Sequence, residues 1–121
     1  MNEEEFRNGT KDMAGEVSFI KADSTKNELH LLPIGALQSI GEVLTFGARK
    51  YAHGNWRNVD KRSRYFGAML RHAFAWWRGA DKDPETGLSH LAHLGCCALF
   101  LLECEIDSLG EDDRPRPTMK R

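Results

Sequence analysis

The sequence predicts an all-α protein with three main helices, over about residues 33–51, 64–78 and 88–106. In the first of these segments apolar residues recur at every third or fourth position, which is the spacing of one face of a helix. The other two segments are apolar around most of their circumference. Two such helices in a chain of 121 residues predict a helical bundle that is completed by oligomerisation, as a dimer or a larger homo-oligomer.

The first helix is expected to begin near Pro33, because proline suits the first turn of a helix. Its apolar face carries Ala36, Leu37, Ile40, Val43, Leu44, Ala48 and Tyr51. Its opposite face carries Gln38, Glu42, Thr45 and Arg49. Glu42 is the only acidic residue of this helix, and such a residue is ordinarily solvated unless another part of the assembly covers it.

The ends of the other two helices are marked by small polar residues and glycine. Ser63 is expected to cap the N-terminus of the second helix, and Gly79 is expected to end it. Either Thr86 or Ser89 is expected to cap the third helix. These signals divide the chain into an N-terminal arm, a helical domain and a disordered polar tail, over residues 1–30, 31–107 and 108–121. The arm is partly extended, and the alternation of Val17 and Phe19 with polar residues fits a short strand or an extended segment.

The composition limits the classes of function. Seventeen basic and eighteen acidic residues give a net charge of −1, which argues against general nucleic-acid binding but not against a small anionic ligand. The longest nearly apolar run, residues 91–102, is shorter than the ~20 residues of a membrane span, and the polar N-terminus shows no signal segment. All three cysteines lie in the third helix, so we expect no disulfide framework and a cytoplasmic protein.

Residues 71–100 gather most of the groups that can bind metal or phosphate. His90, His93 and Cys97 share one stripe of the third helix, and together they can bind a soft transition metal. The alternative is that Cys97 is a small core residue and the histidines form hydrogen bonds across a helix interface. A structural Zn²⁺ site is not expected, since a fourth ligand is not evident.

The loop before the third helix is acidic, with Asp81, Asp83 and Glu85. Carboxylate oxygens are the ligands that Mg²⁺ and Mn²⁺ prefer, so this loop can contribute to a divalent-metal site. Alternatively, these acids are solvated and favour the positive end of the helix dipole.

On the second helix, Arg71 can bind phosphate in a bidentate manner, and His72 is either catalytic or a buried core histidine. Lys26 and Lys50 are further candidates for phosphate contacts. Several aromatic and amide side chains are candidates for contacts with a base, although aromatic residues here are as readily part of the core: Tyr51, Asn55, Trp56 and Trp76.

From residue 26 to about residue 103 the chain resembles the N-terminal domain of phage dATP/dGTP diphosphohydrolases, which are MazG-like proteins of the MazZ type. The resemblance rests on these pieces: Pro33, Ala36-Leu37, Glu42-Val43, Phe46-Gly47-Ala48, Lys50-Tyr51, Asn55-Trp56, Arg71-His72, Asp83-Pro84-Glu85, Gly87-Leu88 and His90-Leu-Ala-His93. It implies a MazG-like helical bundle that oligomerises, encoded by a phage and acting in the host cytoplasm. It also implies that water attacks the α-phosphorus of a purine deoxynucleoside triphosphate, which yields the monophosphate and pyrophosphate with Mg²⁺ or Mn²⁺ as cofactor.

With this resemblance we expect Glu42, Glu85, His72 and His90 to be catalytic. The expected metal ligands are Glu42, Asp83, Glu85, His90 and His93, and the expected substrate contacts are Lys26, Lys50, Tyr51, Asn55, Trp56, Arg71 and Trp76. The wider superfamily carries its metal ligands in ExxE and ExxD pairs, and neither pair falls on the expected helices. This scarcity of carboxylates leaves a second hypothesis open, a non-catalytic protein that sequesters a signalling nucleotide.

Overall fold

A computed structural model describes residues 18–20 and 26–116 of the chain. Most of the predicted arm, residues 1–30, therefore lies outside the described residues. The alternation of Val17 with Phe19 falls partly outside them too, since Val17 is not among the residues described.

The chain divides into two units, Met1–Leu32 and Pro33–Arg121. Among its described residues, the first unit contains one short 3-10 helix, η1 (Leu29–Leu31). The second unit contains three α-helices and one 3-10 helix, which are α2 (Ile34–Lys50), η2 (Asn55–Asn58), α3 (Ser63–Trp77) and α4 (His90–Asp107). The all-α prediction is confirmed, and each α-helix begins and ends within two residues of its expected bounds.

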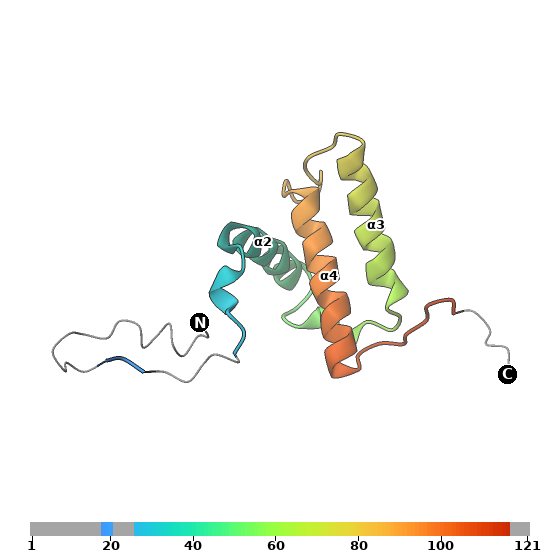
Figure 1. Cartoon of the computed structure of the whole chain (residues 1–121). Coiled ribbons are helices and arrows are strands. Elements are labelled where there is room, and N and C mark those ends of the chain that lie inside the picture. The colour runs from blue at the N-terminus through green and yellow to red at the C-terminus, as the bar shows by residue number, and fades with distance from the viewer. Residues whose placement is uncertain (1–17, 21–25, 117–121) are drawn as a thin grey trace, which may run out of the picture. The chain divides into compact units, whose positions relative to one another are not determined.

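In the second unit α3 and α4 run side by side in opposite directions, and α2 lies across α4 (Figure 1). Ile40 of α2 packs against Gly95 of α4. A β-carbon built on Gly95 would lie 2.8 Å from Cδ1 of Ile40. The absence of a side chain at this position therefore lets α2 approach α4 closely.

The buried residues of the described chain all belong to α4, because this helix lies between α2 and α3. They are His90, Ala92, Cys96, Cys97 and Cys104. The three cysteines are free thiols, as their position in one helix predicts. Burial raises the pKa of Cys96 to about 12, which favours the neutral thiol. No helix among the described residues is long and apolar enough to cross a membrane.

The helix ends differ from the expectation at one point. Ser63 is the first residue of α3 rather than its N-cap. Its backbone N–H and its hydroxyl both donate to the Asp113 carboxylate, at 3.0 and 2.5 Å. A carboxylate from the C-terminal segment therefore satisfies this helix end, which a local sequence pattern does not reveal. At the N-terminus of α4, Ser89 is the N-cap as expected, and its hydroxyl accepts a hydrogen bond from the backbone N–H of Leu91 at 3.0 Å.

The segment that follows α4, which we expected to be part of a disordered tail, contacts the start of α3. Glu111 donates its backbone N–H to the Asp60 carbonyl at 2.8 Å and accepts from the backbone of Arg62 at 3.0 Å. The Arg62 side chain donates to the carbonyls of Leu109 and Cys104, at 2.9 and 3.1 Å. These bonds attach residues 109–113 to the bundle.

Candidate functional site

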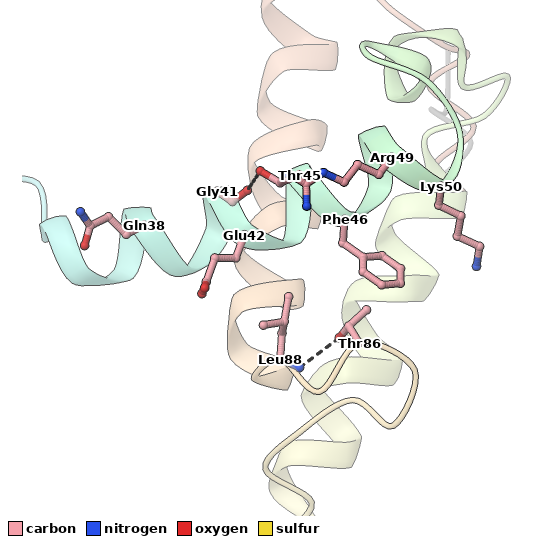
Figure 2. Close-up of a pocket in the computed structure, with 9 residues that line it drawn as sticks. All are labelled: Gln38, Gly41, Glu42, Thr45, Phe46, Arg49, Lys50, Thr86 and Leu88. Atoms are coloured by element: carbon pink, nitrogen blue, oxygen red, sulfur yellow. Dashed lines mark hydrogen bonds between the residues drawn. The ribbon is translucent and has the colours of Figure 1, made fainter.

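A cavity of about 820 Å³ runs along the polar face of α2 (Figure 2). Seven of its lining residues come from this helix and two from the loop before α4, namely Gln38, Gly41, Glu42, Thr45, Phe46, Arg49 and Lys50, with Thr86 and Leu88. The four polar residues that the sequence placed opposite the apolar stripe of this helix all line the cavity. Helical periodicity alone therefore placed these four side chains on one face of the helix, and the structure shows that this face lines the cavity.

The side chains of Glu42 and Phe46 point from α2 towards the loop that carries Thr86 and Leu88 (Figure 2). Glu42 is the only carboxylate among the lining residues, whereas Arg49 and Lys50 bring two positive charges. The Thr45 hydroxyl donates to the Gly41 carbonyl at 2.8 Å, so its proton is not directed at a ligand. The cavity wall that α2 forms is thus basic near the C-terminus of this helix, and it carries one acid, Glu42, near the middle of the helix.

At the basic end Lys50 forms an ion pair with Glu85, at 2.5 Å between Nζ and Oε2. Both side chains are exposed. Lys50, which we expected to contact phosphate, and Glu85, which we expected to be catalytic, therefore neutralise each other in this structure. Surface pairs of this kind contribute little to stability, so an anionic ligand can displace Glu85 at low cost.

A cluster of three histidines joins α3 to the beginning of α4. Nδ1 of His72 lies 2.9 Å from Nδ1 of His90, so one nitrogen donates and the other accepts. The His72 ring stacks on the His93 ring, with centroids 4.5 Å apart and planes inclined by 12°. His90 is only 6 % exposed, which makes it the buried polar residue of the described chain.

Asp83 is held beside these histidines by the turn that precedes α4. Its Oδ2 accepts from the backbone N–H groups of Glu85 and Thr86, both at 3.0 Å, and from the Thr86 hydroxyl at 3.2 Å. An aspartate that bonds to the backbone two and three residues later forms a rigid local turn. The Asp83-Pro84 pair in the sequence favours a turn here for the same reason.

Thr86 connects the cavity with the histidine cluster. With its proton donated to Asp83, the hydroxyl accepts from the backbone N–H of Leu88 at 3.1 Å and from Nε2 of His93 at 2.8 Å. Thr86 also lines the cavity. The Thr86 side chain therefore lies against both a polar cavity and a group of imidazoles. From the sequence we expected it only as a possible helix cap.

The surroundings favour the neutral form of His72 and His93 and the ionised form of Asp83. Burial and the neighbouring His93 and His90 lower the pKa of His72, and burial likewise lowers the pKa of His93. Partial burial alone would raise the pKa of Asp83, but hydrogen bonds from Thr86 and the proximity of His93 bring it below its ordinary value. Near neutral pH the cluster therefore offers unprotonated imidazole nitrogens beside an ionised carboxylate, the forms that ligate metal ions.

The structure does not bring the five predicted metal ligands to one point. Asp83 and His90 lie together, with potential ligand atoms of these two and of His72 all within 4.8 Å of one another. His93 adjoins them, whereas Glu42 lies in the cavity on α2 and Glu85 is paired with Lys50. Sequence spacing could not reveal this division, because it depends on how three helices pack.

The predicted substrate contacts are distributed in the same way. Tyr51, Asn55 and Trp56 line a second cavity of about 280 Å³, on the apolar side of α2. The Trp56 ring stacks on Phe100, with centroids 4.6 Å apart, so it is part of the packing between η2 and α4.

The remaining predicted contacts are Arg71, Trp76 and Lys26, and none of them is among the residues that line the α2 cavity. Arg71 is exposed on α3, close enough to His72 to lower the pKa of that histidine. Trp76 is 41 % exposed beside Trp77. Lys26 belongs to the first unit, Met1–Leu32.

Fold and site together define an all-α domain with a partly basic cavity next to a histidine and carboxylate cluster. The chain belongs to the family described as dATP/dGTP diphosphohydrolase, N-terminal, whose model matches residues 19–114. It is 33 % identical over 95 residues to a dATP/dGTP diphosphohydrolase of Salmonella phage PMBT28, an alignment that covers 78 % of this chain. The same alignment covers 32 % of the phage protein, so the chain spans about a third of that relative's length. No solved structure matches the chain.

Proposed function

We propose that this chain binds purine deoxynucleoside triphosphates in the α2 cavity and takes part in their hydrolysis to monophosphate and pyrophosphate. The observation that carries the proposal is the cavity of about 820 Å³ that combines Glu42 with Arg49 and Lys50. Membership of a family named for dATP and dGTP supports the nucleotide as the ligand. Pockets of roughly 300–1,000 Å³ are typical of small-molecule sites, so this cavity suits a ligand of nucleotide size.

In this proposal the triphosphate lies at the basic end of α2. Arg49 and Lys50 contact its anionic oxygens, and Lys50 exchanges its pairing with Glu85 for a phosphate. Glu42, about two helical turns earlier, accepts a hydrogen bond from the attacking water and orients it. Phe46 and Leu88 exclude bulk water from one side of the cavity, which strengthens these charge interactions.

The family resemblance implies Mg²⁺ or Mn²⁺, and the cavity fits a metal that arrives with the nucleotide. Mg²⁺ in such sites is bound by one or two carboxylates together with the phosphates of the substrate. Glu42 is the carboxylate of the cavity that would hold it. When bound, the ion would neutralise charge that develops on the leaving pyrophosphate.

Sequestration without hydrolysis is a second candidate, and one observation favours it. Glu42 is the only acidic residue among those lining the cavity. Capture of a nucleotide needs cations and aromatic rings but no carboxylates, so the same cavity could retain its ligand unaltered.

One experiment separates the two candidates. The purified protein is incubated with a pool of nucleotides, with and without Mn²⁺ or Mg²⁺, and mass spectrometry identifies both what stays bound and what is converted. Metal-dependent release of dAMP or dGMP with pyrophosphate is the expected result. Intact nucleotide retained without metal would instead establish sequestration, and neither retention nor conversion of any nucleotide would overturn both.

Two variants test the role of the cavity. Glu42→Gln should lower the rate of pyrophosphate release about 100-fold or more while nucleotide still binds, because it removes a group that acts on the attacking water. Glu105→Gln makes the same chemical change on an exposed position of α4 and should leave the rate unaltered. Equal rates for the two variants would remove Glu42 from the mechanism.

A further inference from the structure

We propose that His72, Asp83 and His90 bind a divalent first-row transition-metal ion in preference to Mg²⁺. This site is distinct in its donors from the carboxylate of the α2 cavity. Binding of the ion here does not depend on nucleotide hydrolysis, so each can be tested without the other.

The spacing of the donor atoms fits a single ion. Two nitrogens that ligate one ion at about 2.1 Å and at right angles are about 3.0 Å apart. The two facing Nδ1 atoms of His72 and His90 are 2.9 Å apart. One potential ligand atom each of His72, Asp83 and His90 lies within 4.8 Å of the other two. Small changes in side-chain torsions can therefore bring these three atoms to one ion.

The alternative is that His72 and His90 form only a structural hydrogen bond. In that arrangement the ring nitrogen of His90 opposite Nδ1 makes no hydrogen bond to any residue in the described part of the chain, although His90 is only 6 % exposed. Buried polar nitrogens without a partner are rare in native proteins. An ion between the two Nδ1 atoms would leave this opposite nitrogen as it is, so the case for the ion rests on the spacing of the donor atoms and on Asp83 beside them.

The surroundings already resemble the outer shell of a metal site. Metal-ligating side chains are usually oriented by further hydrogen bonds, and Asp83 accepts three, from the backbone of Glu85 and from the backbone and hydroxyl of Thr86. His93 is bonded to Thr86 and its ring stacks on that of His72, which limits the rotation of the His72 ring. Asp83 and His72 are therefore already partly oriented, and only small side-chain movements are needed to bind an ion.

The donor set determines which ion is preferred. Mg²⁺ strongly favours oxygen ligands, whereas two imidazoles and one carboxylate suit Mn²⁺, Fe²⁺, Co²⁺ and Zn²⁺. Cys97 is not part of the set, because the ligand atoms that lie together are those of His72, Asp83 and His90. We therefore expect nitrogen and oxygen ligation without sulfur.

Paramagnetic broadening tests the site in the unmodified chain. The protein is freed of metal with a chelator, and imidazole resonances are followed by NMR as Mn²⁺ is added below one equivalent, with no nucleotide present. The chain has five histidines, so His30 and His53 serve as internal controls. Resonances of His72, His90 and His93 should broaden first. Equal broadening of all five, or none, would overturn the proposal.

Calorimetry and the visible spectrum of bound Co²⁺ give the affinities. One equivalent of Co²⁺ should bind at least tenfold more tightly than Mg²⁺. His72→Asn should weaken Co²⁺ binding tenfold or more, whereas His53→Asn, at an exposed position, should leave it unchanged. Circular dichroism verifies that each variant is folded, and the NMR titration decides the outcome if His72→Asn is not. Mg²⁺ binding as tight as Co²⁺ binding would contradict the preference.

Discussion

Tyr65 connects three elements through a single side chain. Its hydroxyl donates to the carbonyl of Trp56 in η2 at 2.6 Å, and its ring lies 5.0 Å from that of Phe100 in α4. Burial, with a smaller contribution from the nearby thiols of α4, raises the pKa of Tyr65 to about 12. The neutral phenol is thus the form that the fold stabilises.

An absorbance titration should show this directly. The chain has two tyrosines, Tyr51 and Tyr65, and one of them should ionise only near pH 12. Tyr65→Phe should remove that late step, and Tyr51→Phe should retain it. Because the folded-state pKa is raised, the stability that Tyr65 contributes is present below pH 10 and is lost as pH rises through about 12. If the late step disappeared in Tyr51→Phe instead, the high pKa would belong to Tyr51 and the prediction for Tyr65 would be wrong.

At the scale of elements, Gly95 determines how closely α2 approaches α4. A β-carbon at this position would lie 2.8 Å from Cδ1 and 3.2 Å from Cγ1 of Ile40. A glycine inside a helix ordinarily costs about 0.5–1 kcal/mol relative to alanine. Here close packing between two helices offsets that cost, and the same packing positions the cavity wall on α2.

Replacement of this glycine should therefore separate the two helices. Gly95→Leu should lower the free energy of unfolding by about 1–3 kcal/mol through overpacking, as measured by urea denaturation. Ile40→Ala in the same chain should restore part of the loss, because it makes room for the new side chain.

A second helical glycine supplies the control. Gly41→Ala adds a β-carbon in α2 with no atom within 4 Å, and it should raise stability by about 0.5–1 kcal/mol. If Gly95→Leu were as stable as the unmodified chain, α2 would not be packed on Gly95.

At the scale of the whole molecule, the second unit exposes large apolar side chains on two helices. On α3, Phe66, Phe74 and Trp77 lie within one face and are 50, 56 and 80 % exposed. On α4, the exposed residues of one face are Leu91, Leu99, Leu102 and Ile106. Large exposed apolar patches often mark contacts between proteins.

We propose that a second copy of the chain covers the α3 face, as the two broadly apolar helices of the sequence predict. Light scattering after size-exclusion chromatography should then give a dimer or a larger homo-oligomer. Phe74→Glu should shift the population to monomer, because it places a charge within the contact. Arg64→Glu adds the same residue on the other side of α3 and should leave the mass unchanged. A monomeric unmodified chain would contradict the proposal.

The sequence could predict the helices and which polar side chains share a face of α2, because both follow from local periodicity. The spacing of Gln38, Glu42, Thr45 and Arg49 places them on one face of a helix whatever that helix packs against. The capping role of Ser63 could not be predicted correctly, since the carboxylate that satisfies this helix end comes from Asp113, fifty residues later.

What the sequence by itself determined is the all-α class, the bounds of three helices and the kinds of side chain available for chemistry. Only the tertiary structure decided which of them meet. It placed His72 with Asp83 and His90, separated Glu42 from that group and paired Glu85 with Lys50. The physical reason is that helix formation depends on neighbours three and four positions away, whereas a site depends on the packing of α2 and α3 against α4.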